Sequence, residues 1–424
     1  MTDFKNVSKF KITGNYGKDI SLVGKGSFTF LILQQSLLDD SVRGSFRVAD
    51  TGYRADKKES KSLEESDDLN ITTGEKVELV ISDNKGNKID INLAIEDVDY
   101  SSSSTMAEML NVSLCSDDFI KMQFNKSAPY KHFDGKIHEI VKKVLTDHLK
   151  TEQDINVDPT LNTLPINGSI TDNPLDFCTA LAPKCIPQSL PKSSGYLFYN
   201  TTEGYNFKSI DLLFKQKPKR KMTYTESTGL PSGFTNKILK VSFQNNMNIT
   251  NILKTSSLTK ADLETFDPYT NEKTYTTRDS KDDYKEGNAA DEKPKIAAHL
   301  KVEDESTTII NQIYNTGVLP TGSNTQKQLE NAKEPSFDLE SIVRQSLARY
   351  NQLFLYKAAI LIHGDFDIRP GDMIECVFPE ISSKDIIKNK SKKKSGKYLV
   401  CDVAHYINAE HCYTRLNIVR DSIS

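Results

Sequence analysis

The chain of 424 residues contains no tryptophan and only six cysteines. Six thiols are too few to cross-link a chain of this length, so a disulfide-rich secreted scaffold is excluded. The longest apolar run, residues 353–362, contains Lys357, whereas a bilayer span needs about 20 apolar residues. The first residues contain no apolar leader-like segment. We therefore expect neither a membrane span nor a secretory signal.

An excess of one charge sign is also missing. There are 55 Lys and Arg against 58 Asp and Glu, for a net charge of −3. A chain this close to neutral is not a general polyanion binder, so any contact with nucleic acid would have to be local. At roughly 100–200 residues per domain, the length corresponds to about two to four domains.

Catalytic signatures are absent as well. The sequence contains no GxSxG, no HExxH, no phosphate-binding GxxxxGK[ST] and no CxxC pair. We therefore expect no enzyme, with no catalytic, cofactor or metal residues. One zinc alternative joins Cys401, His405, His411 and Cys412 across a hairpin. It is disfavoured because positions 401 and 405 lie about 13 Å apart along a strand.

The first 115 residues have the period-two alternation of β-strands, in residues 28–33, 77–81 and 89–95. Asn84 and Gly86 lie between the last two runs and suit a tight turn, which predicts a hairpin. Residues 56–68 are almost wholly polar and are expected to form a loop. Residues 1–115 are thus predicted to form a first small antiparallel β-barrel.

Residues 116–235 have a different pattern and are expected to form an α+β insert domain. Apolar residues at helical spacing predict a helix over 137–149, with Asp134 as its N-cap. A second helix is expected to begin at Asn173 and Pro174. Aromatic-rich strands are predicted at 196–200 and 205–214.

A second barrel is expected from residues 236–263 together with 336–424. In the strand 237–243 the face with Leu239, Val241 and Phe243 should be buried. Residues 264–335 are charged and polar and are expected to be a loop-like excursion or linker that includes part of the insert domain. A helix from 339, capped by Ser336, should precede strands at 358–363, 373–378, 397–405 and 412–419, with a turn at 369–372.

A lysine-rich run between the second and third of these strands includes Lys392, Lys393 and Lys394. It has no interleaved aromatic residues, which a stacking site for single-stranded nucleic acid would need. A solvated hairpin tip is the first interpretation. Contact with an acidic partner or with passing DNA is the alternative.

The order of four segments resembles the baseplate central hub proteins of contractile-tailed bacteriophages, especially those of T-even-type myoviruses. The segments are ISLVGKGSFTFLILQQSLLDDSVRGSFRVADTG, HFDGKIHEIVKKVLTDHL, NPLDFCTALAP with SGYLFYNTTEGYNFKSIDLLF, and the C-terminal stretch containing IRPGD and GKYLVCDVAHYINAEHCYTRLNIVR. The resemblance covers most of the chain in order.

This resemblance implies a homotrimer in which each chain has two similar tube-forming barrels plus helix-containing inserts. Such a hub adapts a sixfold tail tube to a threefold central spike and contacts baseplate wedge proteins, with DNA passing through its lumen. The implied location is the virion tail baseplate, assembled in the host cytoplasm. A type VI secretion hub has the same architecture.

Two other functions remain open. Acid pairs such as Glu64–Glu65 and Asp117–Asp118 permit a tail-associated glycosidase or peptidase that digests the cell wall. The 17 tyrosines and the many strands permit a glycan-binding adhesin.

Overall fold

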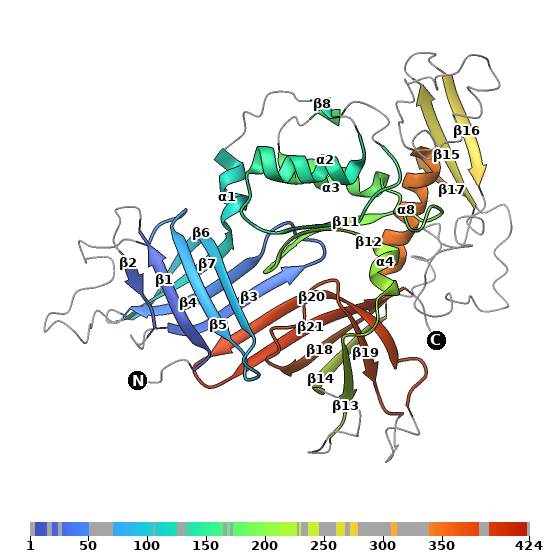
Figure 1. The fold of residues 1–424 in the computed structure, drawn as a ribbon. Coiled ribbons are helices and arrows are strands. Elements are labelled where there is room, and N and C mark those ends of the chain that lie inside the picture. The colour runs from blue at the N-terminus through green and yellow to red at the C-terminus, as the bar shows by residue number, and fades with distance from the viewer. Residues whose placement is uncertain are drawn as a thin grey trace, which may run out of the picture.

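The protein is described by a computed structural model (Figure 1). The described residues are 5–14, 19–23, 28–50, 71–104, 107–124, 132–133, 135–163, 168–169, 173–226, 229, 236–245, 260–267, 272–278, 307–311, 339–380 and 390–421. The expected loop 56–68 and the expected cap Ser336 lie outside them. Among the described residues, no helix is both long and apolar enough to cross a membrane.

Thirteen strands join into one sheet that contains two modules. The first module consists of β1 (Val7–Thr13), β2 (Asp19–Ser21), β3 (Phe28–Ser36), β4 (Arg43–Asp50), β5 (Lys76–Ser82), β6 (Lys88–Ser104) and β7 (Ala107–Ser116). The second consists of β13 (Arg220–Tyr224), β14 (Asn236–Asn245), β18 (Tyr356–His363), β19 (Met373–Val377), β20 (Gly396–Asn408) and β21 (Cys412–Arg420).

The two modules have the same strand order. In space the first runs β3-β4-β7-β6-β5-β1 and the second runs β14-β18-β21-β20-β19-β13. Strand β19 pairs with both β13 and β20, which closes the second module into a six-stranded barrel. The prediction of a β-rich fold with two similar modules is therefore confirmed. One detail differs from an all-antiparallel barrel, because β13 runs parallel to both of its neighbours.

Residues 117–215, between the modules, form the helical insert above the sheet in Figure 1. Its larger elements are α1 (Asp117–Phe124), α2 (Ile137–Lys143) continuing as the π-helical η1 (Val144–Leu149), α3 (Pro174–Leu181), the 3₁₀ turn η2 (Ala182–Lys184) and α4 (Ile210–Lys215). Its strands are β8 (His132–Phe133), β9 (Ile155–Val157), β10 (Gly168–Ser169), β11 (Tyr196–Thr201) and β12 (Gly204–Ser209).

The predicted helices of the insert are present, with one change at a cap. The Asn173 side chain accepts hydrogen bonds from the backbone N–H groups of Leu175 and Asp176, so the predicted N-cap is confirmed. The expected cap Asp134 lies outside the described residues, and the N-cap position of α2 is occupied by Lys136, which makes no side-chain cap bond. The predicted apolar face of this helix is buried along its whole length.

The strand predicted at 205–214 is wrong in its second half, where α4 forms instead. Ile210, Leu213 and Phe214 are buried at i, i+3 and i+4 in one cluster between the insert and the second module. A strand would have placed Leu213 on the opposite face from the other two. Helical spacing is therefore what allows all three side chains to be buried together.

The buried face of β14 also differs from the prediction. Its pairing with β18 slips between Ile238 and Lys240. Such a bulge reverses the alternation, so Ile238 is buried in the barrel core while Leu239 is only half-buried. Val241 and Phe243 pack against the same core, as expected.

The segment expected to be a polar loop at 264–335 contains strands. β15 (Lys260–Asp267) pairs with β16 (Glu272–Arg278) and with β17 (Thr307–Asn311) in a separate three-stranded sheet. Helix α8 (Leu339–Leu353) follows and leads back to β18. This connection between β14 and β18 is drawn at the upper right of Figure 1.

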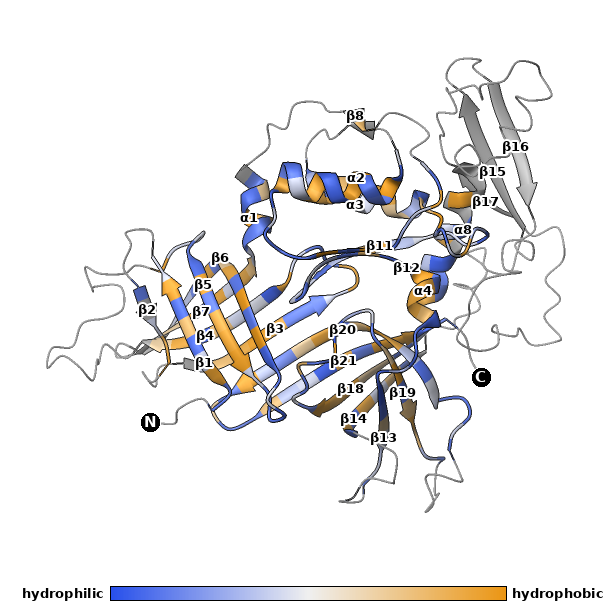
Figure 2. Ribbon diagram, viewed as in Figure 1, coloured by the Kyte–Doolittle hydropathy of each residue, from blue (hydrophilic) through white to orange (hydrophobic). Residues whose placement is uncertain are grey.

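Each module has its own hydrophobic core, and the insert has a third. Figure 2 shows hydrophobic residues along the strands of both modules and on α2 and α3. The first core also includes Phe366, Ile407 and Cys412 from the second module. The modules are thus joined by packing as well as by strand pairing.

Candidate functional site: the seam between the modules

The two modules meet where β20 pairs antiparallel with β3. The register aligns Asp402 with Ser36, His405 with Leu33, and Asn408 with Phe30. His405 and Leu33 are fully buried at this seam. The sheet therefore continues without a break from one module into the other.

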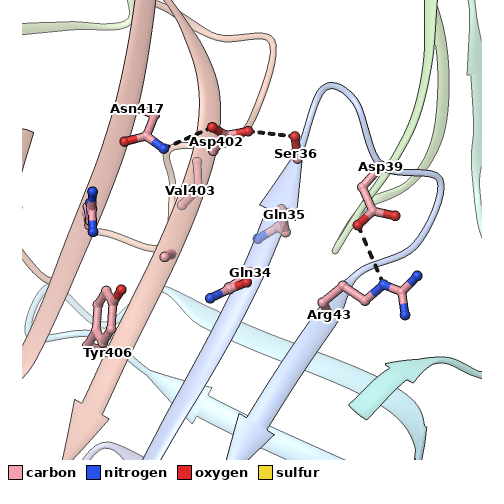
Figure 3. A pocket seen from close by; sticks show the side chains of 11 residues that line it. Gln34, Gln35, Ser36, Asp39, Arg43, Asp402, Val403, Tyr406 and Asn417 are labelled. Carbon is pink, nitrogen blue, oxygen red and sulfur yellow. Dashed lines mark hydrogen bonds and ion pairs between the residues drawn. The ribbon is translucent and has the colours of Figure 1, made fainter. Parts of the chain in front are cut away.

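On the other face of the seam, polar side chains surround a pocket of about 310 Å³ (Figure 3). Ser36 Oγ donates to Asp402 Oδ1 at 2.5 Å, and Asn417 Nδ2 donates to Asp402 Oδ2 at 3.0 Å. Arg43 Nε lies 3.5 Å from Asp39 Oδ2. The bonds of Asp402 connect β21, β20 and β3, so side-chain hydrogen bonds cross the seam as well as backbone pairing.

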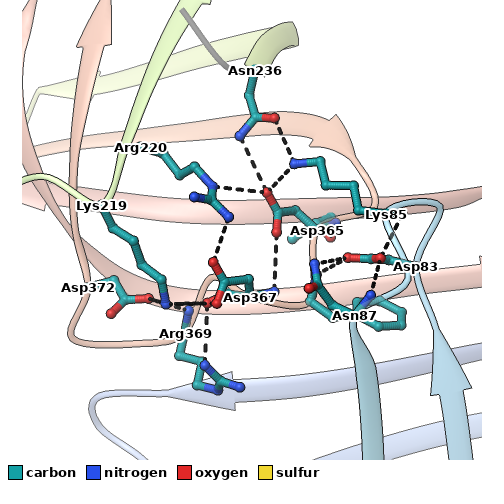
Figure 4. A network of polar contacts seen from close by, with 12 residues as sticks. Asp83, Lys85, Asn87, Lys219, Arg220, Asn236, Asp365, Asp367, Arg369 and Asp372 are labelled. Atoms are coloured by element: carbon teal, nitrogen blue, oxygen red, sulfur yellow. Dashed lines mark hydrogen bonds and ion pairs between the residues drawn. The ribbon is translucent and has the colours of Figure 1, made fainter.

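The tip of the β5–β6 hairpin of the first module is hydrogen-bonded to the second module (Figure 4). Asp83 accepts from the backbone N–H groups of Lys85 and Asn87 within its own turn, and from the N–H of Phe366 in the second module at 3.0 Å. The predicted hairpin turn is confirmed, and Gly86 has the expected positive φ of 89°. Its docking onto the other module could not be seen in the sequence.

The same network buries a carboxylate. Asp365 is fully buried and accepts from Lys85 Nζ at 2.7 Å, with Arg220 Nε at 3.6 Å. Burial alone would raise the pKa of this carboxyl, but the Lys85 hydrogen bond and charge together with Arg220 hold the pKa below its ordinary value. The junction thus contains an ion pair that the hairpin tip completes.

An equivalent turn precedes β5 in one module and β19 in the other. Residues 71–75 read Ile-Thr-Thr-Gly-Glu and residues 368–372 read Ile-Arg-Pro-Gly-Asp. Gly74 has a φ of 85° and Gly371 a φ of 92°, the region that favours glycine. The turn predicted at 369–372 is confirmed.

The acidic residue that ends each turn makes the same bond. Glu75 Oε2 accepts from the backbone N–H of Thr72 at 3.1 Å, and Asp372 Oδ2 accepts from that of Arg369 at 2.9 Å. The pattern Ile-x-x-Gly-acid is thus an internal repeat. It was present in the sequence, but the spacing alone is too common to identify it.

A buried ion triad ties the long β14–β18 connection to the insert. Arg349 of α8 lies 2.5 Å from Asp211 of α4 and 3.0 Å from Asp421 beyond β21. All three side chains are almost fully buried, and the two carboxylates favour the charged guanidinium and raise its pKa against the cost of burial. The triad has a structural role, because it fixes where α8 lies.

The zinc alternative is not supported by the geometry. Cys401 packs in the cluster between the insert and the second module, whereas Cys412 packs in the core of the first. His411 is exposed. His405 is hydrogen-bonded to Thr414, and burial lowers its pKa to about 3. These four residues do not converge, and no metal-ligand cluster occurs among the described residues.

The acid pair Asp117–Asp118 lies at the start of α1, beside a groove of about 860 Å³ between the first module and the insert. Lys121 Nζ lies 2.8 Å from Asp117 and 3.5 Å from Asp118, and Asp118 also accepts from Thr151 and Gln153. These contacts tie the helix to the insert. The pair Glu64–Glu65 lies outside the described residues.

Lys392, Lys393 and Lys394 form a turn directly before β20. Lys392 and Lys393 are exposed, whereas Lys394 is half-buried with its Nζ 4.9 Å from the centroid of the Phe243 ring. The turn corresponds to the β5–β6 hairpin tip of the first module, because both connect the equivalent strand pairs.

Among solved structures the chain has the fold of phage tail proteins. The tail protein of Neisseria meningitidis MC58 aligns over 98% of this chain and 97% of its own, with a TM-score of 0.52 at 11% identity. The 43 kDa tail protein of prophage MuSo2 from Shewanella oneidensis aligns over 99% and 100%, with a TM-score of 0.52 at 10% identity. No protein-family profile and no curated protein matches the sequence.

Proposed function

We propose that the protein, which has the fold of phage tail proteins, is the central hub of a contractile-tail baseplate and acts as a homotrimer. In that role three chains present six similar modules to the tail tube and a threefold arrangement to the central spike. Its contribution is shape, and the proposal includes no catalytic step.

The observation that carries the proposal is the duplicated module. Two units with the same strand order lie side by side in one sheet within a single chain. Because a rotational symmetry repeats every interface, a ring of three such chains offers six near-equivalent positions. A duplicated chain can therefore meet both a sixfold and a threefold partner.

The proposed partners are a tail tube protein on one face, a spike protein on the other and wedge proteins outside, with DNA passing through the lumen without specific binding. The site of action is the virion tail baseplate, after assembly in the host cytoplasm. Lys392, Lys393 and Lys394 are proposed as partner contacts, since Lys392 and Lys393 are exposed in the turn before β20.

Sedimentation of the purified chain over a wide concentration range tests the proposal. A species with the mass of three chains is expected, since obligate interfaces bury roughly 2,000–5,000 Å². Monomer at every concentration, both alone and with the cognate spike, would contradict it. Hydrolysis of purified cell wall that a single carboxylate substitution abolishes would favour the enzyme instead.

A further inference from the structure

A second pocket, of about 390 Å³, lies between the insert and the second module. The insert contributes residues of β11, β12 and α4, and the second module contributes the turn 369–372. The pocket shares no lining residue with the pocket at the seam. Its volume is at the lower end of the range for small-molecule sites, so it can hold a small molecule or one end of a longer one.

The pocket depends on how the repeated turn differs between the modules. Gly371 lies so close to the insert that a Cβ there would be 2.5 Å from Tyr199 Oη, whereas the equivalent Gly74 has no described atom within 4 Å of its Cβ position. Arg369 and Pro370 line the pocket, and the first module has threonine at both equivalent positions. The first module therefore has no corresponding pocket at this turn among the described residues.

The charged side chains that line the pocket are arranged as ion pairs, one of which is drawn in Figure 4. The pairs are Lys208–Asp158 at 3.1 Å, Lys219–Asp372 at 3.2 Å and Arg369–Glu203 at 2.8 Å. Each cation is thus balanced by a carboxylate that lines the same pocket. Because the charges cancel, the pocket has no net charge with which to attract a free ion.

Tyr199 supplies a hydroxyl that lacks a partner. The residue is only 3% exposed and lines the pocket, and its Oη makes no hydrogen bond to any described residue. The Oη is not one of the fully enclosed atoms that lack a partner, so it is open to the pocket. A buried hydroxyl without a hydrogen bond costs free energy, which a ligand hydroxyl would recover.

The same phenol is a donor at neutral pH. Burial, aided by the charges of Asp372 and Asp158, raises the pKa of Tyr199 above its ordinary value. The hydroxyl therefore keeps its proton and can donate it to a ligand oxygen.

Two side-chain amides supply acceptors. Asn206 Nδ2 donates to Thr201 Oγ1 and to the Gly204 carbonyl, and Gln216 Nε2 donates to the Gly371 carbonyl. Both residues line the pocket, and no described residue donates to either amide oxygen. The pocket thus combines an unused donor with unused acceptors.

This combination suits hydroxyl groups better than ions. A hydroxyl both donates and accepts, so neighbouring hydroxyls of one ligand can match both kinds of group. A free anion can only accept, and a metal-free cation such as an ammonium group can only donate, so each would leave part of the set unmatched. Leu212 and Pro370 add apolar surface, which the C–H groups of a sugar ring can contact.

We infer that the pocket between the insert and the second module binds a neutral sugar unit, with its hydroxyls bonded to Tyr199 and to the amides of Asn206 and Gln216. The sugar is either a free molecule or the terminal unit of a glycan chain. The inference goes beyond the proposed hub function and does not depend on it.

Sugar binding by the full chain tests the inference. Free glucose, galactose, mannose, rhamnose and N-acetylglucosamine are titrated by calorimetry, and oligosaccharides that end in the same sugars are presented on a glycan array. At least one sugar should bind in one of the two forms, and binding on the array alone would identify a chain end. Binding of none of them, or of sodium sulfate in their place, would overturn the inference.

Two variants test the assignment to this pocket. Tyr199→Phe removes only the hydroxyl and should weaken binding about fivefold, the effect of one lost hydrogen bond. Gln216→Ala changes an exposed residue and should weaken binding without affecting the fold. Tyr406→Phe makes the same change in the pocket at the seam and should bind like the parent. Unchanged binding by both the Tyr199 and the Gln216 variants would overturn the assignment.

The outcomes separate this inference from the hub proposal. A trimer that binds none of the sugars would overturn the inference and leave the hub standing. A chain that binds a sugar through Tyr199 but sediments only as a monomer would overturn the hub and leave the pocket standing.

Discussion

The two modules share a strand order, a glycine turn and two bulges, yet they differ in what connects the strands. The bulges lie between β3 and β4 and between β6 and β7 in the first module, and between the equivalent pairs β14–β18 and β20–β21 in the second. Between β3 and β4 the first module has a six-residue turn, residues 37–42, whereas between β14 and β18 the second has a connection that includes β15–β17 and α8. The second module is closed by β13, whereas the first ends at β1 and β2. The two modules thus have the same strand order but different connections between the strands. This is expected if the sheet, and not its connections, performs the function that the two modules have in common.

The largest expected effect comes from the buried ion triad that joins α8 to the insert and to the end of the second module. Arg349→Met would leave Asp211 and Asp421 buried without their cation, which should cost about 3–5 kcal/mol of unfolding free energy. Urea unfolding measures the loss. As a control, replacing Asp211 and Asp421 with Leu in the same chain should recover most of it. An Arg349→Met variant as stable as the parent would show that the triad does not fix α8.

The next comparison uses the repeated turn. Gly371→Val meets both a positive φ and a clash, because a Cβ would lie 2.5 Å from Tyr199 Oη, and should cost about 2–4 kcal/mol. Gly74→Val has a similar φ but no atom within 4 Å, and should cost about 1–2 kcal/mol. Thermal melts of both variants check the order. Equal losses would mean that the contact with the insert contributes nothing.

A smaller effect is expected where the tip of the β5–β6 hairpin contacts the second module. Lys85→Met removes the closest cation from buried Asp365 and should cost about 1–2 kcal/mol at pH 7. Because the Asp365 pKa is lowered on folding, its stabilising contribution is present above an unfolded pKa of about 3.9 and is lost as the pH falls through the folded value. The difference between variant and parent should therefore vanish in acid. The exposed Lys88→Met is the control, and a pH-independent difference would contradict this account.

The smallest effect is a gain of stability at the turn between β3 and β4. Burial, aided by the charges of Asp39 and Asp176, raises the pKa of Asp40 to about 6. For an acid with a raised pKa, stability falls as the pH rises from about 4 to about 6. Asp40→Asn should raise the melting temperature at pH 7 and leave it unchanged at pH 4. A variant that melts lower at pH 7 would show that the charged form is stabilised there.

The sequence predicted those parts of the fold that local patterns determine. The β5–β6 hairpin and the helices at 137 and 173 follow from period-two or helical spacing and from turn or cap residues. The resemblance of segment order supplied the expectation of two similar modules. Bulges could not be predicted. The bulge in β14 places Ile238 in the barrel core, where Leu239 was expected.

The seam was missed because its determinants are not local. Asp83 contacts the backbone of Phe366, which is 283 residues away, and no pattern links the two positions. The repeat itself is hidden because equivalent residues differ in type, as Thr72 and Arg369 do. The isoleucine, the glycine and the acid are retained, and the glycine and the acid are the two that the backbone geometry of the turn needs.

The most direct test of the central claim is to image purified particles end-on by electron microscopy. The account predicts a closed ring of three chains in which six similar lobes surround a central hole. Particles with two, four or more chains, or rings with only three distinguishable lobes, would contradict it.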